Sequence, residues 1–197
     1  MSILLIAGSP SEHSRSAALL DAVQERLGGH VLVDRLHIRD LFPQALLLAD
    51  VNHKSISHAL AQVASARALV VATPIYKAAY SGVLKVFLDL LPQTALKGKL
   101  VLPLATGGSP HHMLALDYAL RPVLQSLAAS HVLTGIYATD AQVPKDDDGE
   151  YQVGSEIATR LDDAVNTLFK EILRMPLAAG PTTGFPPVPF EQMRCSV

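Results

Sequence analysis

The chain has 197 residues, of which 49% are hydrophobic and 17% are charged, and its formal net charge is −2. This length favours one domain with some spare chain, and the charge excludes a polybasic nucleic-acid binder and a strongly acidic disordered chain. The single cysteine, Cys195, excludes an internal disulfide framework and a four-cysteine zinc site. Because the charged fraction lies below the roughly 25% usual for soluble domains, we expect apolar surface to be buried between the subunits of a homo-oligomer.

No apolar run approaches the ~20 residues that a membrane-spanning helix needs. The first eight residues, MSILLIAG, lack the basic region with which a signal peptide begins. We therefore expect a cytoplasmic protein with neither a membrane nor a nucleic acid as its partner.

Short apolar runs alternate with amphipathic segments along the chain. Five strands are predicted from the runs at residues 3–7, 31–36, 68–72, 99–105 and 132–138. Thr73 and Pro74 are expected to stop the third strand. Five helices are predicted from apolar residues at helical spacing, at residues 19–27, 57–66, 84–91, 113–127 and 157–172, whereas 40–48 stays ambiguous. This alternation predicts an α/β fold, a flavodoxin-like doubly wound five-stranded parallel sheet of order 2-1-3-4-5 with helices on both faces.

The end of the chain differs in composition from the rest. Five of the thirteen prolines lie in residues 176–197. We expect one domain over residues 1–175, followed by a proline-rich C-terminal tail over 176–197. Such a tail is either loosely attached or docked on a neighbouring subunit.

The loop after the first strand has the composition of an anion site. It places the hydroxyls of Ser9, Ser11, Ser14 and Ser16 and the guanidinium of Arg15 at the start of a helix. Free backbone N–H groups and the helix dipole favour a phosphate there. The alternative is that Ser14 or Ser16 only caps the helix. The loop has neither the G-x-G-x-x-G fingerprint nor the Walker G-K-[ST] sequence.

Two further loops are expected beside the first, because ligands of this fold bind beyond the carboxyl ends of the strands. The loop at residues 73–82 carries Tyr76 and Tyr80 and is suited to present backbone groups beside a flat aromatic ring, unless the tyrosines only pack at an interface. Gly107 and Gly108 follow the fourth strand and let the backbone approach a ligand closely. The adjacent histidines at 111 and 112 have no metal-ligand spacing, so we expect no metal.

The three loops together resemble those of the NAD(P)H-dependent FMN reductases. The resemblance is carried by Gly8-Ser9 with residues 14–16, by residues 73–76 with 81–85, and by residues 106–108. The stretches 76–82, 90–92, 101–108 and 117–124 most closely resemble the FMN reductases of two-component alkanesulfonate monooxygenase systems. The resemblance covers residues 3–174, fades near Asp146 and is lost in the tail.

The resemblance implies roles for particular residues. The phosphate of FMN would be held by Ser9, Ser14, Arg15 and Ser16. The isoalloxazine ring would be lined by Pro74, Ile75, Tyr76 and Lys77, and the pocket closed by Thr106, Gly107 and Gly108. Tyr118 would lie in a π-helical bulge at a tetramer interface, unless it simply packs there, and Pro122 would loosen the same helix independently.

The implied reaction is hydride transfer from NADPH, or NADH, to FMN. Reduced FMN would then leave for a partner flavin-dependent monooxygenase in sulfonate sulfur assimilation. No catalytic acid or base is expected, since the flavin carries the chemistry and the protein positions it. One alternative is an NAD(P)H:quinone or azo reductase that retains FMN. The other is a non-enzymatic electron carrier of the flavodoxin type. Carriers of that type resemble strongly acidic proteins, so the small net charge of −2 argues against the second alternative.

Overall fold

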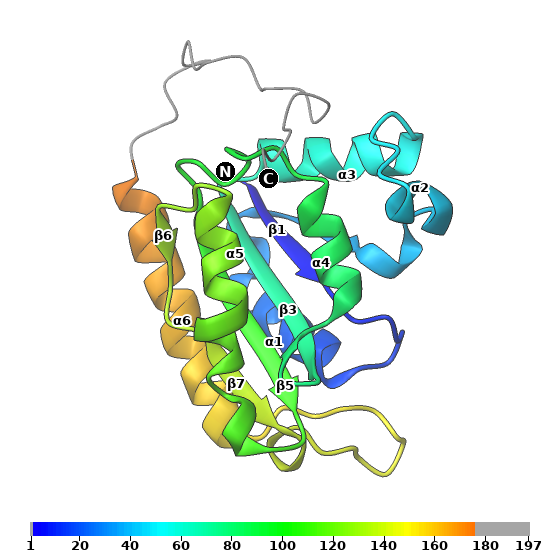
Figure 1. Cartoon of the computed structure of the whole chain (residues 1–197). Coiled ribbons are helices and arrows are strands. Elements are labelled where there is room, and N and C mark those ends of the chain that lie inside the picture. Colours follow the sequence, from blue (N-terminus) through cyan, green and yellow to red (C-terminus); the bar gives the residue numbers. More distant parts are fainter. Residues whose placement is uncertain (1, 176–197) are drawn as a thin grey trace.

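The apolar runs of the sequence form the central sheet of the computed structural model, which describes residues 2–175 (Figure 1). Six of its strands are parallel: β1 Ser2–Ala7, β2 Leu32–His37, β3 Ala68–Tyr76, β5 Leu100–Gly107, β6 His131–Val132 and β7 Ile136–Thr139. The strand order is β2-β1-β3-β5-β6, with β7 also paired to β5. This confirms the predicted flavodoxin-like order, since β6 and β7 together occupy the fifth position.

The fifth strand is not the continuous run that the sequence predicts. β6 pairs at the start of β5, where His131 faces Leu100, and β7 pairs near its end, where Ile136 faces Leu104. Between them the chain passes Pro103, which has no N–H to donate to the ladder. A Cβ on Gly135 would lie 2.8 Å from Leu116 Cδ1 and 3.3 Å from Pro103 Cγ. The break is therefore a close crossing, at which a larger residue than glycine would need Leu116 and Pro103 to shift.

The third strand also differs from its prediction. Thr73 and Pro74 do not stop β3, which continues to Tyr76 and turns back into the short antiparallel strand β4, Ala79–Tyr80. Lys77 and Ala78 form the turn, both at positive φ (51° and 64°). This is the backbone of a two-residue hairpin in which Asn-Gly is usual, so the turn carries no glycine signal in the sequence.

The helices lie in two layers, one on each face of the sheet (Figure 1). α1 (Arg15–Leu27) and α6 (Ser155–Arg174) cover one face, where they bury Ile3 and Leu5. The other face carries α2 (Pro43–Leu47), α3 (Lys54–Ser65), α4 (Gly82–Asp89) and α5 (Arg121–Ser126), which bury Leu4 and Ile6. Because both of their faces are buried, β1, β3 and β5 read as continuous apolar runs, whereas the edge strand β2 alternates in burial.

Short elements complete the chain. The 3-10 turns are η1 Gly28–His30, η2 Ile38–Asp40, η3 Pro110–His112 and η5 Asp140–Gln142. The ambiguous segment 40–48 contains the short helix α2.

In the part of the chain that the structure describes, no helix is both long and apolar enough to span a membrane. The expected tail at 176–197 lies outside the described residues, so the boundary after residue 175 stays a prediction.

The helix predicted at 113–127 is divided in two by a π-helix, η4 Leu116–Leu120. The N–H of Arg121 donates to the carbonyl of Leu116, five residues back, and Pro122 follows immediately with no N–H to restore the α-helical pattern. Tyr118 stands at the centre of η4 and is 77% exposed. The Arg121 side chain donates to the carbonyls of Val132 (3.0 Å) and Leu133 (3.1 Å), which ties the bulged helix to β6.

Candidate functional site

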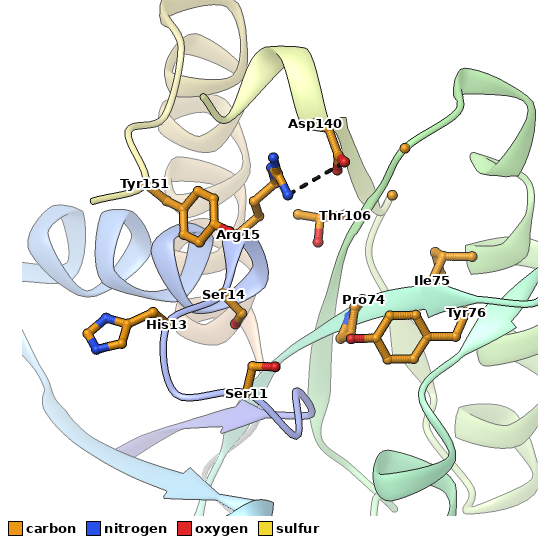
Figure 2. Close-up of a pocket in the computed structure, with 12 residues that line it drawn as sticks. Ser11, His13, Ser14, Arg15, Pro74, Ile75, Tyr76, Thr106, Asp140 and Tyr151 are labelled. Atoms are coloured by element: carbon orange, nitrogen blue, oxygen red, sulfur yellow. Dashed lines mark ion pairs between the residues drawn. The ribbon is translucent and has the colours of Figure 1, made fainter. Parts of the chain in front are cut away.

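The loops at the carboxyl edge of the sheet surround a cavity of about 230 Å³ (Figure 2). They come from elements far apart in the sequence: the loop before α1, the end of β3, the end of β5, and the chain after β7. The lining residues are Ser11, His13, Ser14, Arg15, Pro74, Ile75, Tyr76, Thr106, Gly107, Gly108, Asp140 and Tyr151.

The loop from β1 to α1 begins at Gly8, where the backbone passes close to the end of β3. The N–H of Gly8 donates to the carbonyl of Ala72 (2.8 Å), and a Cβ on Gly8 would lie 3.0 Å from that same oxygen. At the far end of the loop, Ser14 caps α1 by accepting from the N–H of Ala17 (3.2 Å). The N–H groups of Arg15 and Ser16 have no carbonyl partner within the helix, because they precede its first complete turn. The cavity thus borders the positive end of a helix dipole.

Two of the serines expected to bind phosphate do not line the cavity. Ser9 and Ser16 are buried, with 3% and 2% exposed. The Oγ of Ser9 accepts from the N–H of Ser11 (3.1 Å), and the Oγ of Ser16 lies 3.3 Å from the Oγ of Ser14. Both hydroxyls therefore shape the loop, while Ser11 and Ser14 line the cavity.

Arg15 reaches the cavity in a fixed orientation. Its Nε donates to the carbonyl of Val143 (3.1 Å), and its guanidinium carbon lies 4.8 Å from the centre of the Tyr151 ring. Its Nη1 lies 3.5 Å from the carboxylate Oδ2 of Asp140, the ion pair marked in Figure 2. The sequence does not mark Asp140 or Tyr151 as site residues, because the fold alone brings their segments to Arg15. His13 lies in the first loop itself, but nothing in its residue type distinguishes it from the other scattered histidines.

The opposite wall is the end of β3. Figure 2 shows Ile75 and Tyr76 across the cavity from Arg15. Tyr76 is 49% exposed, whereas Ile75 is buried. Lys77 is exposed at the tip of the hairpin and does not line the cavity.

A buried serine joins the first two loops. The N–H of Ser81 donates to Thr73 Oγ1 (3.0 Å), and its own Oγ donates to the carbonyl of Gly8. The same Oγ accepts from the N–H of Leu84 (3.2 Å) and so caps α4. Ser81 is thus a positioning residue that sets the loop after β1 against the loop after β3.

The third wall is the end of β5, where Thr106, Gly107 and Gly108 line the cavity. A Cβ on Gly107 would lie 2.5 Å from the hydroxyl of Tyr137, so no larger residue fits there without movement. That hydroxyl donates to the carbonyl of Ser109 (2.6 Å). Burial, with a smaller contribution from the Asp140 carboxylate, raises the pKa of Tyr137 above its ordinary value, so the phenol remains a donor over a wider range of alkaline pH.

Within residues 2–175, no group of three or more His, Cys, Asp or Glu side chains is arranged to hold a metal ion. His111 and His112 lie on η3 outside the cavity lining.

Comparison with known proteins identifies the family. Residues 1–143 match the family model described as NADPH-dependent FMN reductase. The chain is 45% identical over 175 residues to the FMN reductase (NADPH) of Escherichia coli (strain K12), covering 88% of this chain and 91% of that relative. It is 43% identical over 183 residues to the FMN reductase (NADPH) of Pseudomonas putida, covering 92% and 93%. The crystal structure of the apo form of NADH:FMN oxidoreductase (EMOB) matches with a TM-score of 0.78 at 39% identity, over 91% of both chains. The chain therefore belongs to the NADPH-dependent FMN reductase family, whose enzymes use NAD(P)H and FMN.

Proposed function

We propose that this protein binds FMN in the cavity, transfers a hydride to it from NADPH or NADH, and releases reduced FMN to a partner flavin-dependent monooxygenase that acts on sulfonates. The observation that carries the proposal is that one cavity joins a helix N-terminus and Arg15 on one side with the ends of β3 and β5, including two glycines, on the other.

The residues present fit the phosphate of FMN. Ser14 offers its hydroxyl, and the first turn of α1 offers backbone N–H groups. Arg15 offers its Nη groups, because only its Nε donates to the carbonyl of Val143. Charge-assisted hydrogen bonds of this kind contribute roughly 1.5–3 kcal/mol each. Ser9 and Ser16 support this arrangement from beneath rather than from within the cavity.

The opposite end fits a flat ring. Gly107 and Gly108 present no side chain, and Pro74 and Ile75 add an apolar edge. FMN, when bound, supplies the hydride-accepting chemistry, and this chain supplies binding and orientation. Holding both reactants in contact is itself a large source of rate, so no acid or base among the lining residues is required.

An exposed apolar surface supports assembly into a homo-oligomer, which we expect to be a tetramer. Met113, Leu114 and Tyr118 are 55%, 48% and 77% exposed on the segment that contains η4. β4 packs against η4, so this surface continues toward Tyr76 and the cavity. In this proposal Tyr118 packs at the interface between copies.

Steady-state kinetics of the purified full chain test the activity. We expect NADPH or NADH to be oxidised only when FMN is present, and we expect dialysis to remove most of the flavin. Under anaerobic conditions, reduced FMN should pass through a filter that retains the protein. Turnover that proceeds with a quinone or azo dye on permanently retained FMN, and fails with free FMN, would contradict the proposal.

The link to a partner is tested separately. Reduced FMN produced by this protein should sustain a sulfonate monooxygenase that has no reductase of its own, with sulfite release as the measured product. A monooxygenase that stays inactive with this protein but works with chemically reduced FMN would refute the partnership and leave the reductase activity intact.

A further inference from the structure

Asp140 is the one carboxylate among the residues that line the described cavity. It lies 3.5 Å from the cation that the proposed function assigns to the phosphate of FMN, and its side chain is 48% exposed. A negative charge at an anion site opposes the ligand, so its presence there calls for an explanation.

Asp140 is not needed to orient Arg15. The carbonyl of Val143 fixes the Nε edge of the guanidinium at 3.1 Å, and the ring of Tyr151 covers its face at 4.8 Å. Asp140 touches only Nη1, at a distance longer than an ordinary hydrogen bond. The contact therefore occupies a donor of Arg15 without determining where the guanidinium lies.

The backbone of Asp140 is anchored. Asp140 is the first residue of η5, which begins with a capping box between Thr139 and Gln142. In this capping box the N–H of Thr139 donates to Gln142 Oε1 (2.9 Å). The carbonyl of Gln142 in turn accepts from the N–H of Gly154 (2.9 Å) before α6 begins. Asp140 Oδ2 also lies 3.7 Å from the point that a Cβ on Gly108 would occupy, so the carboxylate stands beside Gly108 at the cavity wall.

We propose that Asp140 sets the affinity for FMN by competing with the phosphate for Arg15, so that flavin is held weakly enough to leave after reduction. This inference rests on the proposed function, in which FMN is a substrate that departs. A phosphate entering the cavity must displace Asp140 from Nη1 or share Arg15 with it. In both cases the negative charge of Asp140 weakens the net electrostatic attraction between Arg15 and the phosphate.

Asp140→Asn tests the inference because it removes the charge and keeps the shape. Titrations that follow flavin fluorescence should show the Kd for FMN lowered about tenfold. The Kd for riboflavin, which has the same ring and no phosphate, should change by less than about twofold. Asp140→Ser should behave in the same way, which guards against a folding defect particular to asparagine.

A matched control removes a carboxylate from an arginine pair elsewhere. Asp162 pairs with Arg26 at 2.6 Å, outside the cavity, so Asp162→Asn should leave both flavin affinities unchanged. The inference is overturned if Asp140→Asn leaves the FMN Kd unchanged, raises it, or tightens riboflavin to the same extent. A raised Kd would mean that Asp140 holds Arg15 in position for the ligand.

The same experiment separates this inference from the function on which it rests. If the unaltered protein binds no FMN, the proposed function fails. If the unaltered protein binds and reduces FMN but Asp140→Asn does not tighten binding, only the role of Asp140 fails.

Discussion

Gly107→Ala is expected to destabilise the protein through one identifiable contact. The added methyl group would lie 2.5 Å from the Tyr137 hydroxyl and 3.4 Å from both Tyr137 Cζ and Ile75 Cβ. The first distance is far below van der Waals contact, and the other two are tight. The Tyr137 hydroxyl has to move, and its hydrogen bond to the Ser109 carbonyl is then lost or stretched.

The size of the effect follows from these contacts. Overpacking of a well-packed region costs about 1–3 kcal/mol, and a broken hydrogen bond to a carbonyl costs about 1 kcal/mol. We therefore expect Gly107→Ala to lower the free energy of unfolding by about 2–4 kcal/mol. FMN binding should weaken as well, because Gly107 lines the cavity.

A double-mutant cycle with Tyr137→Phe identifies the cause. Phenylalanine removes both the clashing oxygen and the hydrogen bond that the clash disturbs, so Gly107→Ala in that background should cost at least about 1 kcal/mol less than in the unaltered protein. Urea unfolding followed by circular dichroism, at one protein concentration for all variants, gives the four free energies. Gly29→Ala is the matched control, because a Cβ at Gly29 meets nothing within 4 Å.

Two results would refute the reasoning. The first is an equal cost of Gly107→Ala with and without the tyrosine hydroxyl, because the clash would then lie elsewhere. The second is a cost no larger than that of the Gly29→Ala control.

Three further predictions concern the site, the pH dependence and the assembly. Arg15→Ala should raise the Kd for FMN tenfold or more, since one charge-assisted contact contributes at least about 1.4 kcal/mol; an unchanged Kd in a fluorescence titration would remove Arg15 from the phosphate site. Burial lowers the pKa of His37 below its ordinary 6.5. The unfolded chain then takes up a proton that the folded protein does not, so stability should fall as the pH drops below 6.5, and less steeply in His37→Gln. Urea midpoints that move equally in both proteins would exclude His37 as the cause. Tyr118→Glu should shift the protein toward smaller species in sedimentation velocity, because Tyr118 is 77% exposed on the proposed interface; an unchanged distribution would place the interface elsewhere.

The central strands could be predicted because strands that are buried on both faces read as apolar runs, and their order followed from the doubly wound fold that their alternation with helices indicates. The run at residues 3–7 and the run at 68–72 are examples, and both occupy the predicted positions. The β3–β4 hairpin could not be predicted, since its turn uses Lys77 and Ala78 at positive φ without a glycine or asparagine. The break in the fifth strand depends on a crossing between Gly135 and Pro103, which only the folded chain brings together.

The candidate site also contains residues that the sequence indicates and residues that only the folded structure brings to it. The side chains on the β1, β3 and β5 loops could be found, because they follow strands directly and the fold places those strand ends at one edge. Asp140 and Tyr151 could not, because their relation to Arg15 depends on how the chain returns after β7. Ser9 and Ser16 have the residue type expected of a phosphate site, yet both are buried and neither lines the cavity. Composition alone does not distinguish a hydroxyl that faces a ligand from one that supports the loop.

The π-helix has a consequence for how this fold can change during evolution. A single residue added to an α-helix would rotate everything after it by about 100°. In η4 one widened turn absorbs the extra residue, and Leu116, Leu120 and Leu124 all remain buried on the same side. A one-residue insertion or deletion within η4 would therefore change the outer surface of the helix, where Tyr118 is exposed, while the packing of the three leucines beneath it is retained.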